Sequence, residues 1–263
     1  MVSLNKELKT RVVNAYSERI SGKPKGQETR KNPSAELNVI QPESCCDDCC
    51  SSDSFDEDTR EVMDKLDIQS FGCGNPVGLS SIVAGDVVVD LGSGAGLDCI
   101  IAGKKVGPAG RVVGIDMSDA MIAKAVENVA KLSLQDIVTF RKGDIEDLPV
   151  EDKFATMVIS NCVIVLAPDK QRVFDEAFRI LRQGGRMIVS DVVSDKDIPD
   201  ELVRDEKLFV NCLSGATRVD RYFGMLHKSG FGTVEELERR TYGKLNHGQG
   251  GIELYSVTVR AVK

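Results

Sequence analysis

Short apolar runs alternate with amphipathic stretches along the middle of this chain, from Asp86 to Val193. The runs are DVVVDL, RVVGIDM, VTFRKGD, ATMVISN and RMIVSDVV, and helical patterns lie between them near 97–105, 118–132 and 169–182. Strands that read as continuous apolar runs are buried on both faces, which is typical of a parallel sheet covered by helices. Because crossovers between parallel strands are right-handed, the pattern predicts a doubly wound α/β layer.

The end of the chain follows a different pattern. After Val193, PDELVRDEKLFVNCL and TRVDRYFGMLHKSG are helical in pattern, with Gly230 as a stop signal, and the strands TVEELERR and IELYSVTVRAV come last. A parallel sheet completed by a late pair of strands, the last one antiparallel, resembles the Rossmann-like fold of class I methyltransferases. The sequence therefore predicts an α/β protein of that class.

The first part of the chain is expected to lie outside this core. Residues 1–20 predict an amphipathic helix, and residues 21–58 are polar and rich in turn-forming residues, which predicts a mobile cysteine-rich arm. We expect three units along the chain. They are the N-terminal helix and arm (1–70), the methyltransferase core (71–193), and cap helices followed by the final strands (194–263).

Composition narrows the class of protein. The 263 residues carry a formal charge of −7, and the basic residues are scattered, which argues against a nucleic-acid partner. No apolar run is long enough to span a membrane, and the N-terminal stretch lacks the apolar segment of a signal peptide. We therefore expect a cytoplasmic protein without a membrane partner. In that reducing compartment the eight cysteines are expected to be ligands or redox-active groups rather than structural disulfides.

Three glycines occupy a predicted strand-to-helix turn in VDLGSGAGLD (89–98). Gly92, Gly94 and Gly96 allow a tight turn and the close approach of a ligand, and the following helix offers free N–H groups. Leu97 holds the position at which the dinucleotide fingerprint has its third glycine. Glycines at such a turn can also serve packing alone, so both interpretations stay open here.

Acidic residues end the next two predicted strands. Asp116 is well placed to accept hydrogen bonds from both hydroxyls of a ribose, and Asp144 and Ile145 can hold an adenine amino group and ring face. Either acid alone could equally be a helix N-cap or a solvated strand end. With the glycines, they resemble the S-adenosyl-L-methionine (AdoMet) site of class I methyltransferases. The residues expected to line that pocket are Gly92, Ser93, Gly94, Asp116, Met117, Asp144, Ile145 and Asn161.

Three single cysteines stand apart from the cysteine-rich arm. Cys162 follows ATMVIS at the carboxyl end of a predicted strand, where doubly wound folds bind ligands. Cys73 lies in the glycine-flanked loop FGCGNP, and Cys212 lies in the segment expected to cap the same edge of the sheet. Cys99 faces inward on the first core helix and is expected to be a small buried hydrophobe. Each of the other three, taken singly, could be the same.

The order of several motifs resembles arsenite methyltransferases. FGCGNP, VVDLGSGAGLD, KVGPAGRVVGIDMSDAMI, SNCVIVLAPDK, AFRILRQGGRMIVSDVV and NCLSGA follow one another as in that family, over about 71–216. The resemblance implies that Cys73, Cys162 and Cys212 are the catalytic residues and jointly bind arsenic(III), with AdoMet as methyl donor. It also implies arsenite or its thiol conjugates as substrate, arsenic detoxification as the role, and thioredoxin or glutathione as reductant.

The chemistry of arsenic suits such a site. Arsenic(III) is soft and thiophilic, and a pyramid of three sulfurs leaves its lone pair opposite them. In-line displacement at a methyl carbon then needs orientation more than acid–base help, so the presence of only two histidines, His227 and His247, is no obstacle. The arm could supply a resolving thiol, chelate a metal or be dispensable. Its cysteines are Cys45, Cys46, Cys49 and Cys50.

Two other functions remain open from the sequence. A small-molecule C- or O-methyltransferase with incidental cysteines would keep full activity after Cys162→Ser. A non-enzymatic thiol-rich metalloid sensor or sequestering protein would bind arsenite irrespective of AdoMet. The intact glycine turn with both acids counts against this second alternative.

Overall fold

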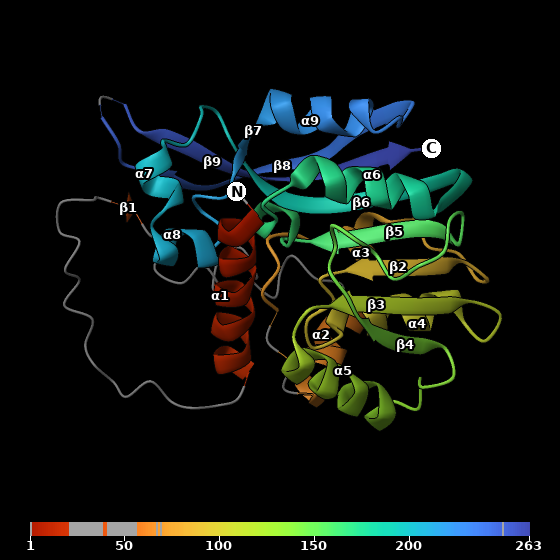
Figure 1. Cartoon of the computed structure of the whole chain (residues 1–263). Helices are drawn as coiled ribbons and strands as arrows, with labels where there is room; N and C mark the ends of the chain where they lie inside the picture. The colour runs from red at the N-terminus through yellow and green to blue at the C-terminus, as the bar shows by residue number, and fades with distance from the viewer. Residues whose placement is uncertain (1, 21–38, 41–56, 67, 69, 249) are drawn as a thin grey trace.

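The computed structural model describes residues 2–20, 39–40, 57–66, 68, 70–248 and 250–263. These residues form a nine-stranded mixed sheet with helices on both faces (Figure 1). The strands are β1 (Val39–Ile40), β2 (Val87–Leu91), β3 (Arg111–Asp116), β4 (Val138–Lys142), β5 (Ala155–Asn161), β6 (Leu181–Ser194), β7 (Thr217–Arg218), β8 (Thr233–Leu245) and β9 (Ile252–Val262). The helices are α1 (Val2–Ile20), α2 (Glu57–Leu66), α3 (Pro76–Leu79), α4 (Leu97–Val106), α5 (Asp119–Lys131), α6 (Lys170–Ile180), α7 (Asp200–Val203), α8 (Glu206–Val210) and α9 (Val219–Lys228), with a 3₁₀ turn η2 (Ile164–Leu166).

The strands lie in the order β1-β8-β9-β6-β5-β2-β3-β4, with β7 beside β6. Strands β2 to β6 are mutually parallel wherever they pair. The last strand, β9, runs antiparallel to both of its neighbours, β6 and β8. The predicted doubly wound sheet with an antiparallel last strand, as in class I methyltransferases, is therefore confirmed.

Burial on both faces explains the continuous apolar runs. In the central strand β2, Val89 and Leu91 pack in one hydrophobic cluster with Phe174 of α6 and residues of α9. Val88 faces the other side of the sheet and packs with α2 and α4, including Ile100. Because successive side chains of a strand point to opposite faces, both sets must be apolar when helices cover both sides.

The segment after β6 differs in detail from the prediction. PDELVRDEKLFVNCL forms two short helices, α7 and α8, instead of one. Asp205 begins α8 as its N-cap, because its carboxylate accepts hydrogen bonds from the N–H groups of Lys207 and Leu208 at 2.9 and 3.1 Å. Helix α9 ends near Gly230 as expected, and Gly230 adopts a φ of 107° that favours glycine.

The N-terminal helix is present as predicted and packs against α5 and α8. Most of the predicted arm, including its four cysteines, lies outside the described residues. Two described residues within it, Val39 and Ile40, pair antiparallel with Leu245 and Lys244 of β8. The division into units 1–70, 71–193 and 194–263 stays a prediction.

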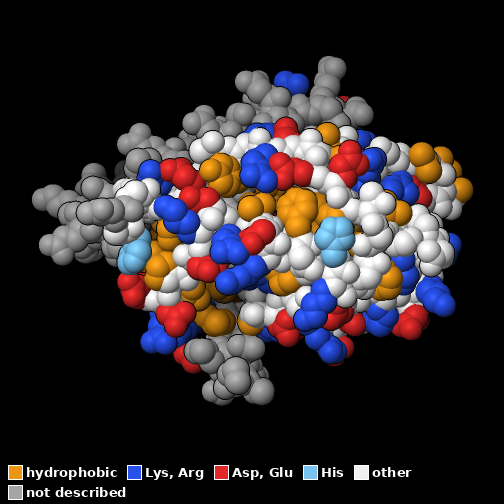
Figure 2. Space-filling model, turned by 90° about the horizontal axis from the view of Figure 1, so that it is seen from above, with side chains coloured by type: hydrophobic (Ala, Val, Ile, Leu, Met, Phe, Trp, Pro, Cys, Tyr) orange, Lys and Arg blue, Asp and Glu red, His pale blue; other side chains and the backbone are white. Residues whose placement is uncertain are grey.

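Two surface properties bear on partners. In the part of the chain that the structure describes, no helix has both the length and the apolarity needed to cross a bilayer. Figure 2 shows that, on the face over α9, Lys and Arg side chains lie beside Asp and Glu side chains instead of forming a continuous basic patch.

Candidate active site

A cavity opens at the carboxyl ends of the parallel strands, where α1 stands upright beside the sheet (Figure 1). It holds about 1130 Å³ of space free of protein atoms, including its opening to solvent. Its walls combine residues of α1, the glycine turn, and the ends of β3, β4 and β5. The eight residues predicted to line an AdoMet pocket all lie in these walls: Gly92, Ser93, Gly94, Asp116, Met117, Asp144, Ile145 and Asn161.

The glycine turn is pinned to the end of the neighbouring strand. The N–H groups of Gly92 and Ser93 donate to the carbonyl of Ile115 at 2.8 and 3.0 Å. Gly92 has a φ of 69°, and a Cβ built on it would lie 2.5 Å from the side chain of Val163. Gly92 therefore cannot carry a side chain without moving its neighbour, and the close approach of backbone to the cavity depends on it.

Asp116 is held from two sides by backbone donors. Its Oδ2 accepts the N–H of Gly94 at 2.9 Å, and its Oδ1 accepts the N–H of Ser118 at 2.8 Å. Burial raises the pKa of this carboxyl, and the backbone hydrogen bonds oppose that rise. Each oxygen keeps a second lone pair, so the carboxylate can still accept hydrogen bonds from two vicinal hydroxyls.

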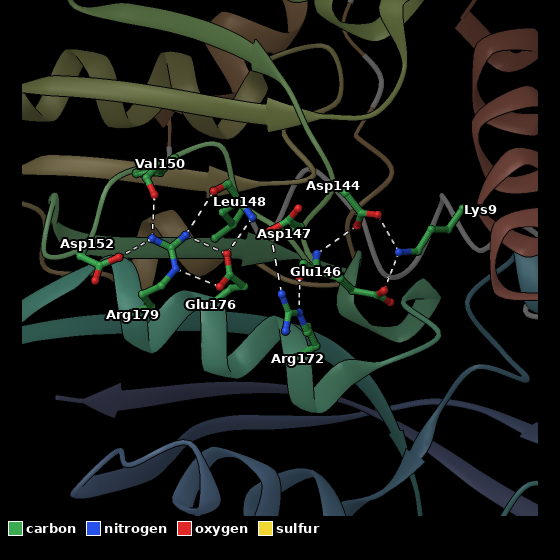
Figure 3. Close-up of polar contacts among 10 residues, drawn as sticks. All are labelled: Lys9, Asp144, Glu146, Asp147, Leu148, Val150, Asp152, Arg172, Glu176 and Arg179. Carbon is green, nitrogen blue, oxygen red and sulfur yellow. Dashed lines mark hydrogen bonds and ion pairs between the residues drawn. The ribbon is translucent and has the colours of Figure 1, made fainter. Parts of the chain in front are cut away.

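Asp144 is bridged to the N-terminal helix. Nζ of Lys9 in α1 lies 2.6 Å from Oδ2 of Asp144 and 2.5 Å from Oε2 of Glu146 (Figure 3). Burial by itself would lower the pKa of Lys9, but the hydrogen bonds to the two carboxylates raise it above its ordinary value. The lysine therefore stays charged and joins α1 to the loop after β4 beside the cavity.

Arg179 of α6 fixes the loop that carries Asp144 (Figure 3). Its guanidinium donates to the carbonyls of Leu148 and Val150 at 3.1 and 2.8 Å and to the carboxylate of Glu176. Glu176 in turn accepts the N–H of Leu148 at 2.8 Å. These hydrogen bonds hold the loop after β4 against α6.

Two carboxylates in the glycine motif, the buried Asp90 and the half-buried Asp98, were not predicted to line the site. Asp90 and Asp98 both line the cavity. Burial raises the pKa of Asp98 to about 6, and burial together with the charge of Asp98 raises the pKa of Asp90 further above its ordinary value. Two acids held away from water are well suited to a cationic ligand, because such a ligand stabilises their charged forms. Cys99 is fully buried as predicted, and its thiol donates to Asp90 at 3.1 Å.

The three single cysteines converge. Cys73, Cys162 and Cys212 are 2%, 5% and 4% exposed, and all three are free thiols in one cluster with Val165 and Leu166. Sγ of Cys212 donates to the carbonyl oxygen of Cys162 at 3.6 Å, and the neighbouring thiols of Cys212 and Cys73 together with burial raise the pKa of Cys162 well above the ordinary value. Cys162 also lines the cavity, so the thiol cluster and the cavity share this residue.

The backbone turns sharply at two of the three thiols. Cys162 follows β5 with a φ of 59°, and Cys212 follows α8 with a φ of 60°. A side chain in this left-handed region costs about 1–2 kcal/mol, and such positions cluster at functional sites. The N–H of Cys162 donates to the carbonyl of Ser190 at 2.8 Å, so the turn is anchored to β6.

Tyr16 of α1 packs against the thiol cluster. Its hydroxyl lies 3.8 Å from Sγ of Cys212 and 3.4 Å from the carbonyl oxygen of Val210. Its ring packs edge-to-face on Phe71, with 5.7 Å between ring centroids, and the guanidinium of Arg19 lies 4.8 Å from the Tyr16 centroid. One helix therefore reaches both the cavity and the thiols.

A buried acid, Asp191, lies next in sequence to Val192 of the thiol cluster. Asp191 of β6 accepts hydrogen bonds from the hydroxyl of Tyr222 and from the N–H of Val192, both at 3.1 Å. Burial raises its pKa to about 7, and burial lowers the pKa of nearby Lys170 to about 8. Asp191 and Tyr222 therefore form a buried, hydrogen-bonded pair.

The thiols adjoin without forming a closed ligand set. Among the residues that the structure describes, no group of three or more His, Cys, Asp or Glu side chains is already arranged to hold a metal ion. An ion that bound all three thiols would draw the sulfurs together. His227 and His247, to which no role was assigned, do not line the cavity.

Comparison with known proteins covers most of the chain. The family described as "Methyltransferase domain" matches residues 82–239. An arsenite methyltransferase of Halobacterium salinarum is 44% identical over 205 residues, which are 76% of this chain and 52% of that protein. An arsenite methyltransferase of Aquipseudomonas alcaligenes is 33% identical over 85% of this chain and 67% of its own length. The chain thus spans about half of the first relative and two thirds of the second.

The crystal structure of CrArsM, an arsenic(III) S-adenosylmethionine methyltransferase from Chlamydomonas reinhardtii, is also similar. The TM-score is 0.65 at 32% identity, and the match covers 85% of this chain and 75% of that one. At that coverage the similarity extends beyond the residues matched by the domain family.

Proposed function

This chain belongs to the arsenite methyltransferase family, and we propose that it transfers methyl groups from AdoMet to thiol-bound trivalent arsenic. The observation that carries the proposal is the position of Cys162. Cys162 packs in one buried cluster with Cys73 and Cys212, its carbonyl oxygen accepts a hydrogen bond from the thiol of Cys212, and it also lines the cavity. A site for soft trivalent arsenic would therefore adjoin a site for the methyl donor.

The cavity wall fits AdoMet in its chemistry. We assign Asp116 to the ribose hydroxyls, and Asp144 and Ile145 to the adenine ring, with Gly92, Ser93, Gly94, Met117 and Asn161 completing the pocket. AdoMet would supply a methyl group on a cationic sulfonium. The carboxylates of Asp90 and Asp98 would stabilise the positive charges of AdoMet. A bound cation would in turn lower the raised pKa values of both carboxyls.

The three thiols would bind arsenite without a separate base. Each thiol replaces one hydroxyl of arsenite, and its proton leaves with that hydroxyl as water, so charge and protons balance. A thiol that stays protonated in the free protein, as the raised pKa of Cys162 indicates, is therefore competent for binding. The arsenic lone pair then forms the bond to the methyl carbon while the sulfonium becomes a neutral thioether, and orientation is the main requirement.

Further methylation needs a reductant. Methyl transfer formally oxidises arsenic by two electrons, and two thiols can return them by forming a disulfide. We propose thioredoxin or glutathione as the source of electrons for that disulfide, and a reducing cytoplasm as the location, because the three buried thiols must be free to bind arsenic. Any contribution of Cys45, Cys46, Cys49 and Cys50 falls on residues outside the described part of the chain.

Methyl transfer from labelled AdoMet to arsenite in excess thiol tests the proposal. Wild type and Cys99→Ser should both form methylarsenicals, because Cys99 is buried away from the trio and serine can still donate to Asp90. Cys162→Ser should form none while still binding AdoMet. Full activity of Cys162→Ser would contradict the proposal and favour a small-molecule C- or O-methyltransferase, which the known relatives do not favour.

A further inference from the structure

Asn161 uses its whole amide group within the protein. Its Oδ1 accepts the N–H groups of Cys73 and Gly74 at 3.1 and 3.3 Å. Its Nδ2 donates to the carbonyl of Gly74 and to Oδ2 of Asp98, both at 3.0 Å. The amide therefore joins two segments that the sheet alone does not connect, the loop that carries Cys73 and the first turn of α4.

The orientation of this amide is fixed by its partners. Two N–H donors face one end of the amide, and two acceptor oxygens face the other. A flipped amide would place Nδ2 against both N–H groups and Oδ1 against a carboxylate and a carbonyl. Since every contact would then be repulsive, only one orientation satisfies the network.

The two ends of Asn161 lead to different parts of the candidate site. Asp98 lines the cavity and is half-buried, with Asp90 beside it. Cys73 is one of the three converging thiols, and its neighbour Gly72 leaves room for the amide. A Cβ on Gly72 would lie 2.3 Å from Nδ2 of Asn161, so the motif FGCG permits this approach.

We propose, on the premise of the function above, that Asn161 is a positioning residue that couples the methyl donor to the arsenic site. A cationic donor beside Asp98 holds that carboxylate in one position, where it accepts the charge-assisted hydrogen bond from Nδ2. The amide is then held more firmly, with Oδ1 toward the N–H groups of Cys73 and Gly74. Bound donor therefore orders the Cys73 loop and raises the affinity of the thiol trio for arsenite.

A second contact on the same loop provides a matched control. The hydroxyl of Ser256 in β9 donates to the carbonyl of Cys73 at 2.6 Å. This bond also holds the Cys73 backbone, but Ser256 is not among the residues that line the cavity. Ser256→Ala should thus weaken arsenite binding without removing the link to the donor.

The test measures arsenite affinity with and without saturating sinefungin, a stable cationic AdoMet analogue. All proteins carry serine in place of the four arm cysteines, Cys45, Cys46, Cys49 and Cys50, so that only the buried trio reports. Sinefungin should raise the arsenite affinity of wild type at least about five-fold, and arsenite should raise the sinefungin affinity by the same factor. In Asn161→Ala the factor should fall below about two-fold, whereas Ser256→Ala should keep it.

A second variant guards against loss of folding. Asn161→Asp keeps the shape and the acceptor for the N–H groups of Cys73 and Gly74 but loses the donor to Asp98 and to the carbonyl of Gly74, and it too should show a factor below about two-fold. A wild-type factor in either Asn161 variant, or no coupling in wild type, would overturn the inference. These are binding measurements, so they are separate from methyl transfer. Transfer without coupling would contradict this inference alone, and coupling without transfer would contradict the proposed function alone.

Discussion

The two halves of the candidate site are built in different ways. The cavity is lined mainly by strand ends and their turns, where backbone hydrogen bonds fix polar groups such as Asp116. The thiol cluster is assembled from three distant segments inside an apolar environment, and two of its cysteines have left-handed backbones. A cavity of the first kind can be recognised from a local motif, whereas a cluster of the second kind depends on how the whole chain packs.

Cys212→Ser should have the largest effect on the thiol cluster and little effect on the cavity. Loss of one of three sulfurs should lower methyl transfer to arsenite at least about 100-fold, because binding and orientation are lost together. AdoMet affinity should stay within about two-fold, since Cys212 does not line the cavity. Transfer assays and calorimetric titration of AdoMet measure the two effects. A comparable fall in AdoMet affinity would show that the halves are not separable.

Asp116→Ala is the converse change. If Asp116 accepts the proposed hydrogen bonds from a ribose, its removal should cost about 1.5–3 kcal/mol, or about a 10- to 100-fold loss of AdoMet affinity. Arsenite affinity in the absence of AdoMet should be unchanged, because Asp116 is not part of the thiol cluster. Titration with each ligand alone checks this, and the matched control is Asp119→Ala, on an exposed carboxylate nearby.

Acid pH should lower the affinity of the cavity for a cationic ligand. Burial raises the pKa of Asp98 to about 6, and a cationic ligand binds its charged form. Below that pKa the carboxyl must lose its proton on binding, so sinefungin affinity should be about ten-fold lower at pH 5 than at pH 7. In Asp98→Asn the profile should lose this step. An unchanged step in the variant would assign the titration to another group.

Tyr16→Phe should have the smallest effect, and it should fall on the thiol half. The ring can keep its packing on Phe71, while the hydroxyl contact with Cys212 is lost. A single weak hydrogen bond to sulfur corresponds to about a two- to five-fold loss of arsenite affinity. AdoMet affinity should be retained, which equilibrium titration can test. A larger loss for AdoMet than for arsenite would show that the aromatic body serves mainly the cavity.

The parallel sheet could be predicted because both faces of its central strands are buried, which leaves continuous apolar runs in the sequence. Val88 and Val89 face opposite sides of β2 and are both covered by helices, so the run DVVVDL carries the signature of a central parallel strand. The break between α7 and α8 could not be read in the same way. Asp205 is a strong N-cap, but in the sequence it stands within an otherwise helical pattern.

The site residues that could be predicted are those fixed by a local motif. The positions predicted for AdoMet lie in one cavity because strand ends of a parallel sheet meet at one edge. Lys9 was not predicted, because its partner Asp144 is 135 positions away and nothing local distinguishes this lysine on an amphipathic helix. Asn161 was predicted as a cavity residue, but no pattern reveals that its amide is directed to the Cys73 loop.

Arsenic X-ray absorption spectroscopy most directly tests the claim that the three buried thiols jointly bind arsenic. The sample is one equivalent of arsenite on protein whose four arm cysteines are replaced by serine, beside the same protein with Cys162→Ser. We expect three sulfur neighbours and no oxygen in the first, and oxygen replacing sulfur in the second. An arsenic with two sulfurs and one oxygen in the protein that keeps Cys73, Cys162 and Cys212 would contradict the three-thiol site.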